Sequence, residues 1–145
     1  MMTLLQTFLG QHGIQHFAAR ELLSKTMRGG RRHEFPPVER WDRILGALKI
    51  ADAIREELGV PVRVLSAYRT PFYNKLVGGS TTSEHVEFRA LDLACVDHDG
   101  LVRVATRLMD EADAAGLATG LGLYPTFVHI DTGATKAHRR RWDER

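Results

Sequence analysis

The sequence is poor in cysteine, since Cys95 is the only one among 145 residues. A single thiol cannot form an internal disulfide. With only one cysteine, a zinc site built from several thiolates is also excluded. Any metal ion bound by this chain must therefore be held by histidine and carboxylate side chains.

Long apolar runs and an excess of charge of one sign are also missing. No stretch approaches the roughly 18 consecutive apolar residues of a membrane span, so we expect no membrane partner. The 20 Lys and Arg against 18 Asp and Glu leave a formal charge of +2. The basic segments 28–32 and 138–141 contain no interleaved aromatic residues for base stacking. We therefore expect solvated loops or tails there, and no binding of nucleic acid.

The start of the chain has no pattern of an export signal. The first charged residue is Arg20, and Gln6, Gln11, His12 and Gln15 interrupt the apolar residues before it. A secretory peptide instead begins with positive charge and continues with an unbroken apolar stretch. We expect synthesis in the cytoplasm without a signal peptide.

Hydrophobic periodicity predicts one α+β domain over residues 1–145. Apolar residues between 38 and 58 recur mostly at spacings of three and four, which is typical of an amphipathic helix that Gly59 and Pro61 end. The other predicted elements are short helical pieces within 3–27, helices over 71–77 and 101–115, and strands over 62–66, 90–96, 121–124 and 127–132. The strands lie too close together for a βαβ series, so we expect a small antiparallel sheet flanked by helices, in a monomer.

Two segments carry side chains suited to a metal site. His85 lies in a loop that leads into the strand 90–96, and Asp92 lies within that strand. His129 lies in the strand 127–132. If the two strands are neighbours, these three side chains can converge on one ion. Two histidines and one carboxylate are a donor set of catalytic zinc sites, which keep one position open.

A third segment, 66–74, adds a cation. Arg69 follows a predicted strand and precedes a predicted helix that begins at Pro71. From this position the guanidinium group can bind a carboxylate or an oxyanion with two parallel hydrogen bonds.

Together the three segments resemble the M15 zinc peptidases, the D-Ala-D-Ala carboxypeptidase and dipeptidase family that acts on bacterial cell-wall peptides. The family patterns are S-x-H-x-x-G-x-A-x-D, an upstream S-G-Y-R-[ST]-P and, in one subgroup, a closing V-H-[VI]-D. Residues that match these patterns are Ser83, His85, Ala90 and Asp92, then Tyr68, Arg69, Thr70 and Pro71, and finally Val128, His129, Ile130 and Asp131. The resemblance extends from about residue 16 to Trp142.

The resemblance implies a hedgehog-like and D-Ala-D-Ala-peptidase-like fold with one Zn²⁺ per chain, bound by His85, Asp92 and His129. It implies that Arg69 orients the substrate and stabilises charge on the scissile carbonyl, and that Ser83 contacts the substrate. A catalytic zinc ion lowers the pKa of its water to about 7 and polarises an amide carbonyl, which makes hydrolysis feasible at neutral pH.

Two departures from the family pattern bear on the site. Phe88 stands where the family has glycine, and a bulky ring there would reshape the rim of the cleft or narrow its access. Thr126 stands where many members carry the carboxylate that acts as general base. We predict that Asp131 replaces it, because residues i and i+2 of a strand project to one face. Asp131 could instead orient His129, and Glu84 or Glu87 could then be the base.

These observations lead to one main hypothesis and one alternative. The main hypothesis is a zinc-dependent peptidase that hydrolyses stem peptides or cross-links of peptidoglycan, of the D,D-carboxypeptidase or endopeptidase type. Because no export signal is recognised, a phage or prophage lysin that reaches the wall after lysis or on a virion fits this hypothesis. A host enzyme that acts on free dipeptides in the cytoplasm is the milder version of it. The alternative is a non-catalytic wall-binding or virion structural module on the same scaffold, motivated by Phe88 and Thr126.

Overall fold

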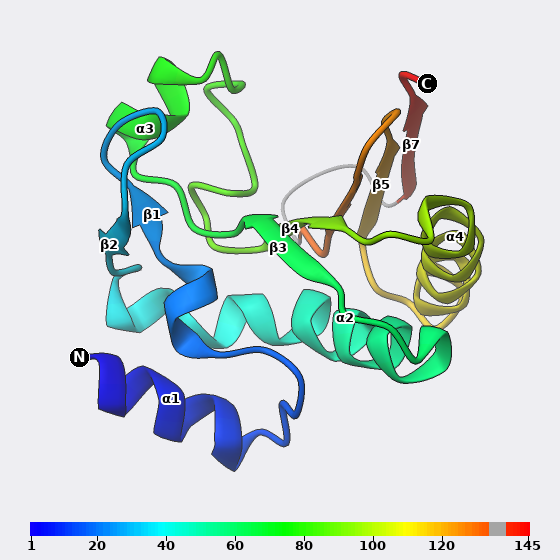
Figure 1. Cartoon of the computed structure of the whole chain (residues 1–145), viewed down its shortest axis with the longest axis horizontal. Coiled ribbons are helices and arrows are strands. Elements are labelled where there is room, and N and C mark those ends of the chain that lie inside the picture. The colour runs from blue at the N-terminus through cyan, green and yellow to red at the C-terminus, as the bar shows by residue number, and fades with distance from the viewer. Residues whose placement is uncertain (134–138) are drawn as a thin grey trace.

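A five-stranded sheet forms the centre of the protein in a computed structural model that describes residues 1–133 and 139–145 (Figure 1). Its strand order is β3–β4–β6–β5–β7. The strands are β3 (Arg63–Ser66), β4 (Ala90–Ala94), β5 (Thr119–Leu123), β6 (Val128–Asp131) and β7 (Arg139–Asp143). All neighbouring pairs are antiparallel except β5 and β7, which run parallel. The α+β class is confirmed, although the sheet is mixed and not purely antiparallel.

Helical segments and a small hairpin make up the other described elements. The helical elements are α1 (Met2–Gln11), the 3₁₀ helices η1 (Ala19–Leu22) and η2 (Val38–Ile44), α2 (Leu45–Leu58), α3 (Pro71–Leu76) and α4 (His98–Ala114). Strands β1 (Ser24–Lys25) and β2 (Arg32–Glu34) pair in a separate two-stranded antiparallel sheet. Within the described residues, no helix is long and apolar enough to cross a membrane.

The two faces of the central sheet differ in chemistry. Leu91 and Leu93 of β4 and Val128 and Ile130 of β6 are fully buried and belong to the hydrophobic core. Helices α2 and α4 contact each other and lie against β4, β5 and β6 (Figure 1). Because side chains alternate along a strand, the residues between these apolar ones project to the opposite face. That face carries the candidate site.

Two predicted helices differ from the observed elements at their starts. The segment 38–58 is divided into η2 and α2, and α2 ends as predicted at Gly59, whose φ of 66° is left-handed. Glycine adopts this conformation without steric cost. Helix α4 begins at His98, earlier than predicted, because the Asp97 side chain accepts a hydrogen bond of 3.0 Å from the Gly100 amide and caps the helix.

Phe88 does not lie at the rim of the cleft, so the expected effect of its ring on access is wrong. Its side chain is fully buried and makes an edge-on contact with the ring of Tyr68, with 6.1 Å between centroids. Its φ of 57° is the only positive value among the described non-glycine residues. A non-glycine residue pays a steric cost in this left-handed conformation. The chain therefore keeps the backbone geometry that favours glycine, and the burial of the ring offsets the strain.

Candidate metal centre

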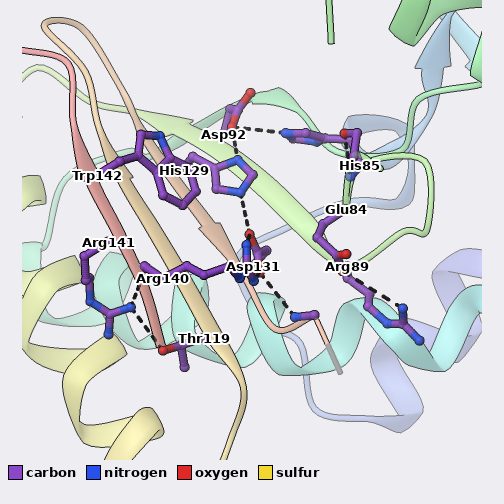
Figure 2. A network of polar contacts seen from close by, with 12 residues as sticks. Glu84, His85, Arg89, Asp92, Thr119, His129, Asp131, Arg140, Arg141 and Trp142 are labelled. Carbon is purple, nitrogen blue, oxygen red and sulfur yellow. Dashed lines mark hydrogen bonds and ion pairs between the residues drawn. The ribbon is translucent and has the colours of Figure 1, made fainter. Parts of the chain in front are cut away.

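Three donor side chains meet on the polar face of the sheet. Asp92 of β4 and His129 of β6 are direct cross-strand partners, and His85 approaches them from the loop before β4 (Figure 2). Among the described residues, these three side chains form the group that could hold a metal ion. One ligand atom from each lies within 4.8 Å of the ligand atoms of the other two. The convergence predicted from the sequence is present in the structure.

His85 is held in one orientation by the backbone. Its Nδ1 lies 2.8 Å from the carbonyl oxygen of Ala67, to which it donates a hydrogen bond, and its Nε2 lies 3.2 Å from Oδ1 of Asp92. Burial lowers the pKa of His85, which outweighs the opposing effect of the Asp92 charge. A neutral ring that donates from Nδ1 presents only a lone pair at Nε2. This lone pair faces a carboxylate oxygen, an arrangement that a cation between them would make favourable.

His129 lies between two carboxylates. Its Nδ1 is 2.9 Å from Oδ1 of Asp92, and its Nε2 is 2.7 Å from Oδ2 of Asp131. Burial by itself would lower the pKa of His129, but the hydrogen bonds to Asp131 and Asp92 and the charges of both carboxylates raise it to about 9. Without metal, His129 is therefore a cation at neutral pH. With metal, Nδ1 would give its lone pair to the ion while Nε2 keeps its proton for Asp131.

Asp131 lies behind His129. The residue is 1% exposed, its carboxylate forms an ion pair with Arg140, and its Oδ1 accepts a hydrogen bond of 3.2 Å from the Gly133 amide. Burial opposes ionisation, but the hydrogen bonds from His129 and Arg140 hold the pKa of Asp131 well below its usual range. These contacts are those of a residue that orients His129, the second role that the sequence left open. The base role stays a prediction, and no contact among residues 1–133 and 139–145 supports it.

The donor set fits a zinc ion. A tetrahedral site with bonds of about 2.0–2.1 Å to nitrogen and oxygen holds its ligand atoms roughly 3.3 Å apart. The distances from Oδ1 of Asp92 to the two histidine nitrogens are 3.2 and 2.9 Å, which is close to this spacing. The hydrogen bonds of His85 to Ala67 and of His129 to Asp131 fix both rings from outside, as is usual for metal-binding histidines.

Metal affinity is expected to rise with pH up to about pH 9. The ion must replace the proton on Nδ1 of His129, whose pKa is raised to about 9, whereas the pKa values of His85 and Asp92 are lowered. One proton is then released per ion, and the apparent affinity increases by about tenfold per pH unit below pH 9. Calorimetric titration of metal-free protein in two buffers of different ionisation enthalpy counts this proton. Asp131→Asn should reduce the count near neutral pH, and an unchanged count would contradict the assignment.

Arg69 lies beside the three donors. Its Nε donates to Oγ of Ser66 at 2.9 Å, its Nη1 to Oδ1 of Asn74 at 3.3 Å, and its Nη2 to Oδ2 of Asp92 at 3.3 Å. The side chain is 16% exposed and lines the cleft. Asp92 thus directs one oxygen to the histidines and the other to Arg69. Burial opposes ionisation of Asp92, but the hydrogen bond from His129 and the positive charge of that ring hold the pKa of Asp92 far below its usual range.

The donors open into a cleft of about 350 Å³. Ser83, predicted to contact the substrate, lines this cleft, and its Oγ accepts a hydrogen bond of 3.2 Å from the His85 amide. Glu84 is buried and lines both this cleft and a neighbouring one. Glu87 lines only the neighbouring cleft, where it pairs with Arg43 at 2.8 Å. Of the two other candidate bases, Glu84 is therefore the one that borders the donors.

Two residues near the site were not predicted from the sequence. Arg140 and Trp142 lie in β7 and line the cleft. The segment 138–141 was expected to be a solvated loop or tail, which is wrong for Arg139–Arg141, while His138 lies outside the described residues. In the other basic segment, Arg32 begins β2 and donates to the backbone carbonyls of Glu21, Val64 and Leu65. In the sequence, the concentration of arginines in the two basic segments did not indicate that residues within them pair as strands.

The fold and the site define an α+β protein with a His–Asp–His group for one metal ion, open to a cleft that contains an arginine. A family model described as peptidase M15 matches residues 15–131, and the chain belongs to this family. The family resemblance seen in the sequence motifs is thereby confirmed. A comparison with curated proteins finds no match.

Proposed function

We propose that this protein is a zinc-dependent peptidase that hydrolyses stem peptides or cross-links of peptidoglycan. The observation that carries the proposal is the meeting of His85, Asp92 and His129 within 4.8 Å at the base of a cleft that Arg69 also lines. Three protein donors leave a position open to water or substrate, which is typical of catalytic and not of structural zinc. Membership of the peptidase M15 family supports the same chemistry.

His85, Asp92 and His129 would hold the zinc ion. When bound, zinc supplies a water of lowered pKa and polarises the carbonyl of the scissile amide. The residues of the chain then divide the remaining tasks. Asp131 keeps the proton of His129 on Nε2 and so directs Nδ1 toward the ion. Arg69 presents a fixed positive charge to the oxygen that becomes negative on the scissile carbonyl.

The substrate is part of the proposal. The stem peptides of peptidoglycan carry free carboxylates and amide carbonyls, both of which accept hydrogen bonds from a guanidinium group such as that of Arg69. Tyr124, Phe127 and Trp142 line the same cleft and supply an apolar wall for the aliphatic parts of such a peptide. The setting that we propose is a lysin made in the cytoplasm that reaches the wall on lysis or on a virion.

Digestion of purified sacculi with and without a chelator tests this function. We expect mass spectrometry to show new peptide ends only in the metal-loaded sample, and the masses identify the bond that is cut. Restoration of cleavage by added Zn²⁺ controls for damage by the chelator. Cleavage that continues in fully metal-free protein would contradict the proposal.

A second candidate is a wall-binding or virion structural module that binds zinc without turnover. The observation that favours it is that both oxygens of Asp131 are engaged by His129, Arg140 and Gly133, while Thr126 offers no carboxylate. Phe88 was the other reason to consider a non-catalytic module, and the burial of its ring removes that reason. Zinc binding and cosedimentation with sacculi, without any new peptide ends, would favour this candidate over the enzyme.

A further inference from the structure

The side chains of β7 alternate between two faces of the sheet. Arg139 and Arg141 reach Asp110 of α4, at 3.0 and 2.8 Å. Arg140 and Trp142 project to the other face, toward the metal centre (Figure 2). Strand β5 lies between β7 and β6, so these two side chains must cross β5 to contact residues of β6.

Arg140 crosses β5 at Gly120. In the sheet register Arg140 is the partner of Gly120, and Gly120 is the partner of Asp131. A Cβ atom on Gly120 would lie 2.4 Å from Oδ2 of Asp131 and 2.7 Å from Nη1 of Arg140. The bare backbone therefore gives the guanidinium group its path. Arg140 donates from Nη1 to Oδ2 of Asp131 at 3.2 Å and from Nη2 to Oδ1, and this two-point contact fixes the plane of the carboxylate.

Trp142 crosses β5 at Gly122 in the same way. Trp142 is the register partner of Gly122, which is the partner of His129. A Cβ atom on Gly122 would lie 2.4 Å from two atoms of the indole ring. The indole centroid lies 5.3 Å from that of His129, and its Nε1 donates to the hydroxyl of Tyr124 at 2.8 Å. The indole is thus held beside the His129 ring.

We propose that β7 completes the metal centre, with Arg140 positioning Asp131 and Trp142 positioning His129, so that Nδ1 of His129 faces the ion. The inference rests on the proposed metal-dependent function. Strand β7 lies beyond residues 15–131, the part of the chain that the family model matches. Gly120 and Gly122 have a definite role in this arrangement, since each keeps the path between β7 and β6 open.

The first test compares zinc affinity in Arg140→Gln and in Arg141→Gln. Both variants remove one guanidinium group from β7, but only Arg140 contacts Asp131. Loss of an outer partner of a metal-binding histidine weakens metal affinity by about 10–100-fold. We expect this loss in Arg140→Gln and an unchanged affinity in Arg141→Gln, measured by competition with a chromophoric chelator. The visible spectrum of the Co²⁺ form should change only in Arg140→Gln, because only its ligand geometry is altered.

A double-mutant cycle tests whether Arg140 acts through Asp131. We expect Asp131→Asn to weaken zinc affinity, and we expect Arg140→Gln to add no further loss in that background. Gly122→Ala removes no polar group, but its added methyl group must displace the Trp142 indole. Weaker zinc binding by Gly122→Ala than by the wild-type protein would therefore support the role of Trp142. Circular dichroism of the metal-free proteins verifies that each variant folds. If Arg140→Gln does not fold, Arg140→Lys takes its place. Weaker zinc binding by Arg140→Lys than by the wild-type protein would then support the proposal.

The outcomes separate this inference from the proposed function. A wild-type protein that binds no zinc would overturn both. If the wild-type protein binds zinc, and Arg140→Gln and Gly122→Ala match it in zinc affinity and in Co²⁺ spectrum, only the inference about β7 is overturned.

Discussion

His85→Ala is expected to lose both the bound metal ion and the hydrolysis of muropeptides. His85 provides one of three donor atoms, and its ring is held by the hydrogen bond to the Ala67 carbonyl. Alanine leaves two donors, and among the described residues no further histidine or carboxylate belongs to the group. We expect zinc affinity to fall by about a thousandfold or more, since each donor carries a large share of the binding free energy.

His33→Ala is the matched control for this result. The His33 side chain is 57% exposed and pairs loosely with Glu34 at 3.8 Å, so its removal should change neither zinc content nor cleavage. Zinc content by elemental analysis and product formation by chromatography give the two readouts for both variants. Cleavage by His85→Ala at the wild-type rate would show that the three donors do not carry the chemistry.

The donors could be predicted from the sequence because each lies at a recognisable strand or at its entrance. The alternation of apolar and polar residues places Asp92 and His129 on the faces of their strands that turn away from the core. The sequence could not reveal that β4 and β6 are neighbours with Asp92 opposite His129. Register depends on contacts between segments that are distant along the chain, and a shift by one residue would turn His129 to the other face.

The role of Asp131 shows the limit of strand periodicity. Residues i and i+2 share a face, so the placement of Asp131 beside His129 is predictable. Whether the carboxylate faces the ion or the outer side of the imidazole depends on the rotamer of His129 and on the partners of Asp131. One of these partners is Arg140, in a strand whose five residues contain three arginines and an aspartate. Such a composition is poor in the residues typical of strands, so pairing with β5 was not predicted.

Arg69→Ala is expected to lower kcat by about 10²–10³ while zinc affinity stays unchanged. Loss of one preorganised donor to a developing oxyanion typically has an effect of this size. Arg69 contacts Asp92 through Oδ2, whereas the histidines contact Oδ1, so its removal leaves the three metal donors in place. Arg69→Lys keeps the charge, but a single amine cannot contact Ser66, Asn74 and Asp92 together. We expect Arg69→Lys to recover only part of the lost rate.

Arg63→Ala provides the matched control, because Arg63 lies in the same strand that leads to Arg69 but is exposed and does not line the cleft. Steady-state kinetics on a purified muropeptide, with zinc content measured on the same samples, separate the two ways in which Arg69→Ala could lose activity. A loss of rate with full zinc content is the result that a charge-stabilising role requires, because only the stabilisation of the transition state is removed. A loss of zinc in proportion to the loss of rate would instead mean that Arg69 acts by holding Asp92 in the ligand position.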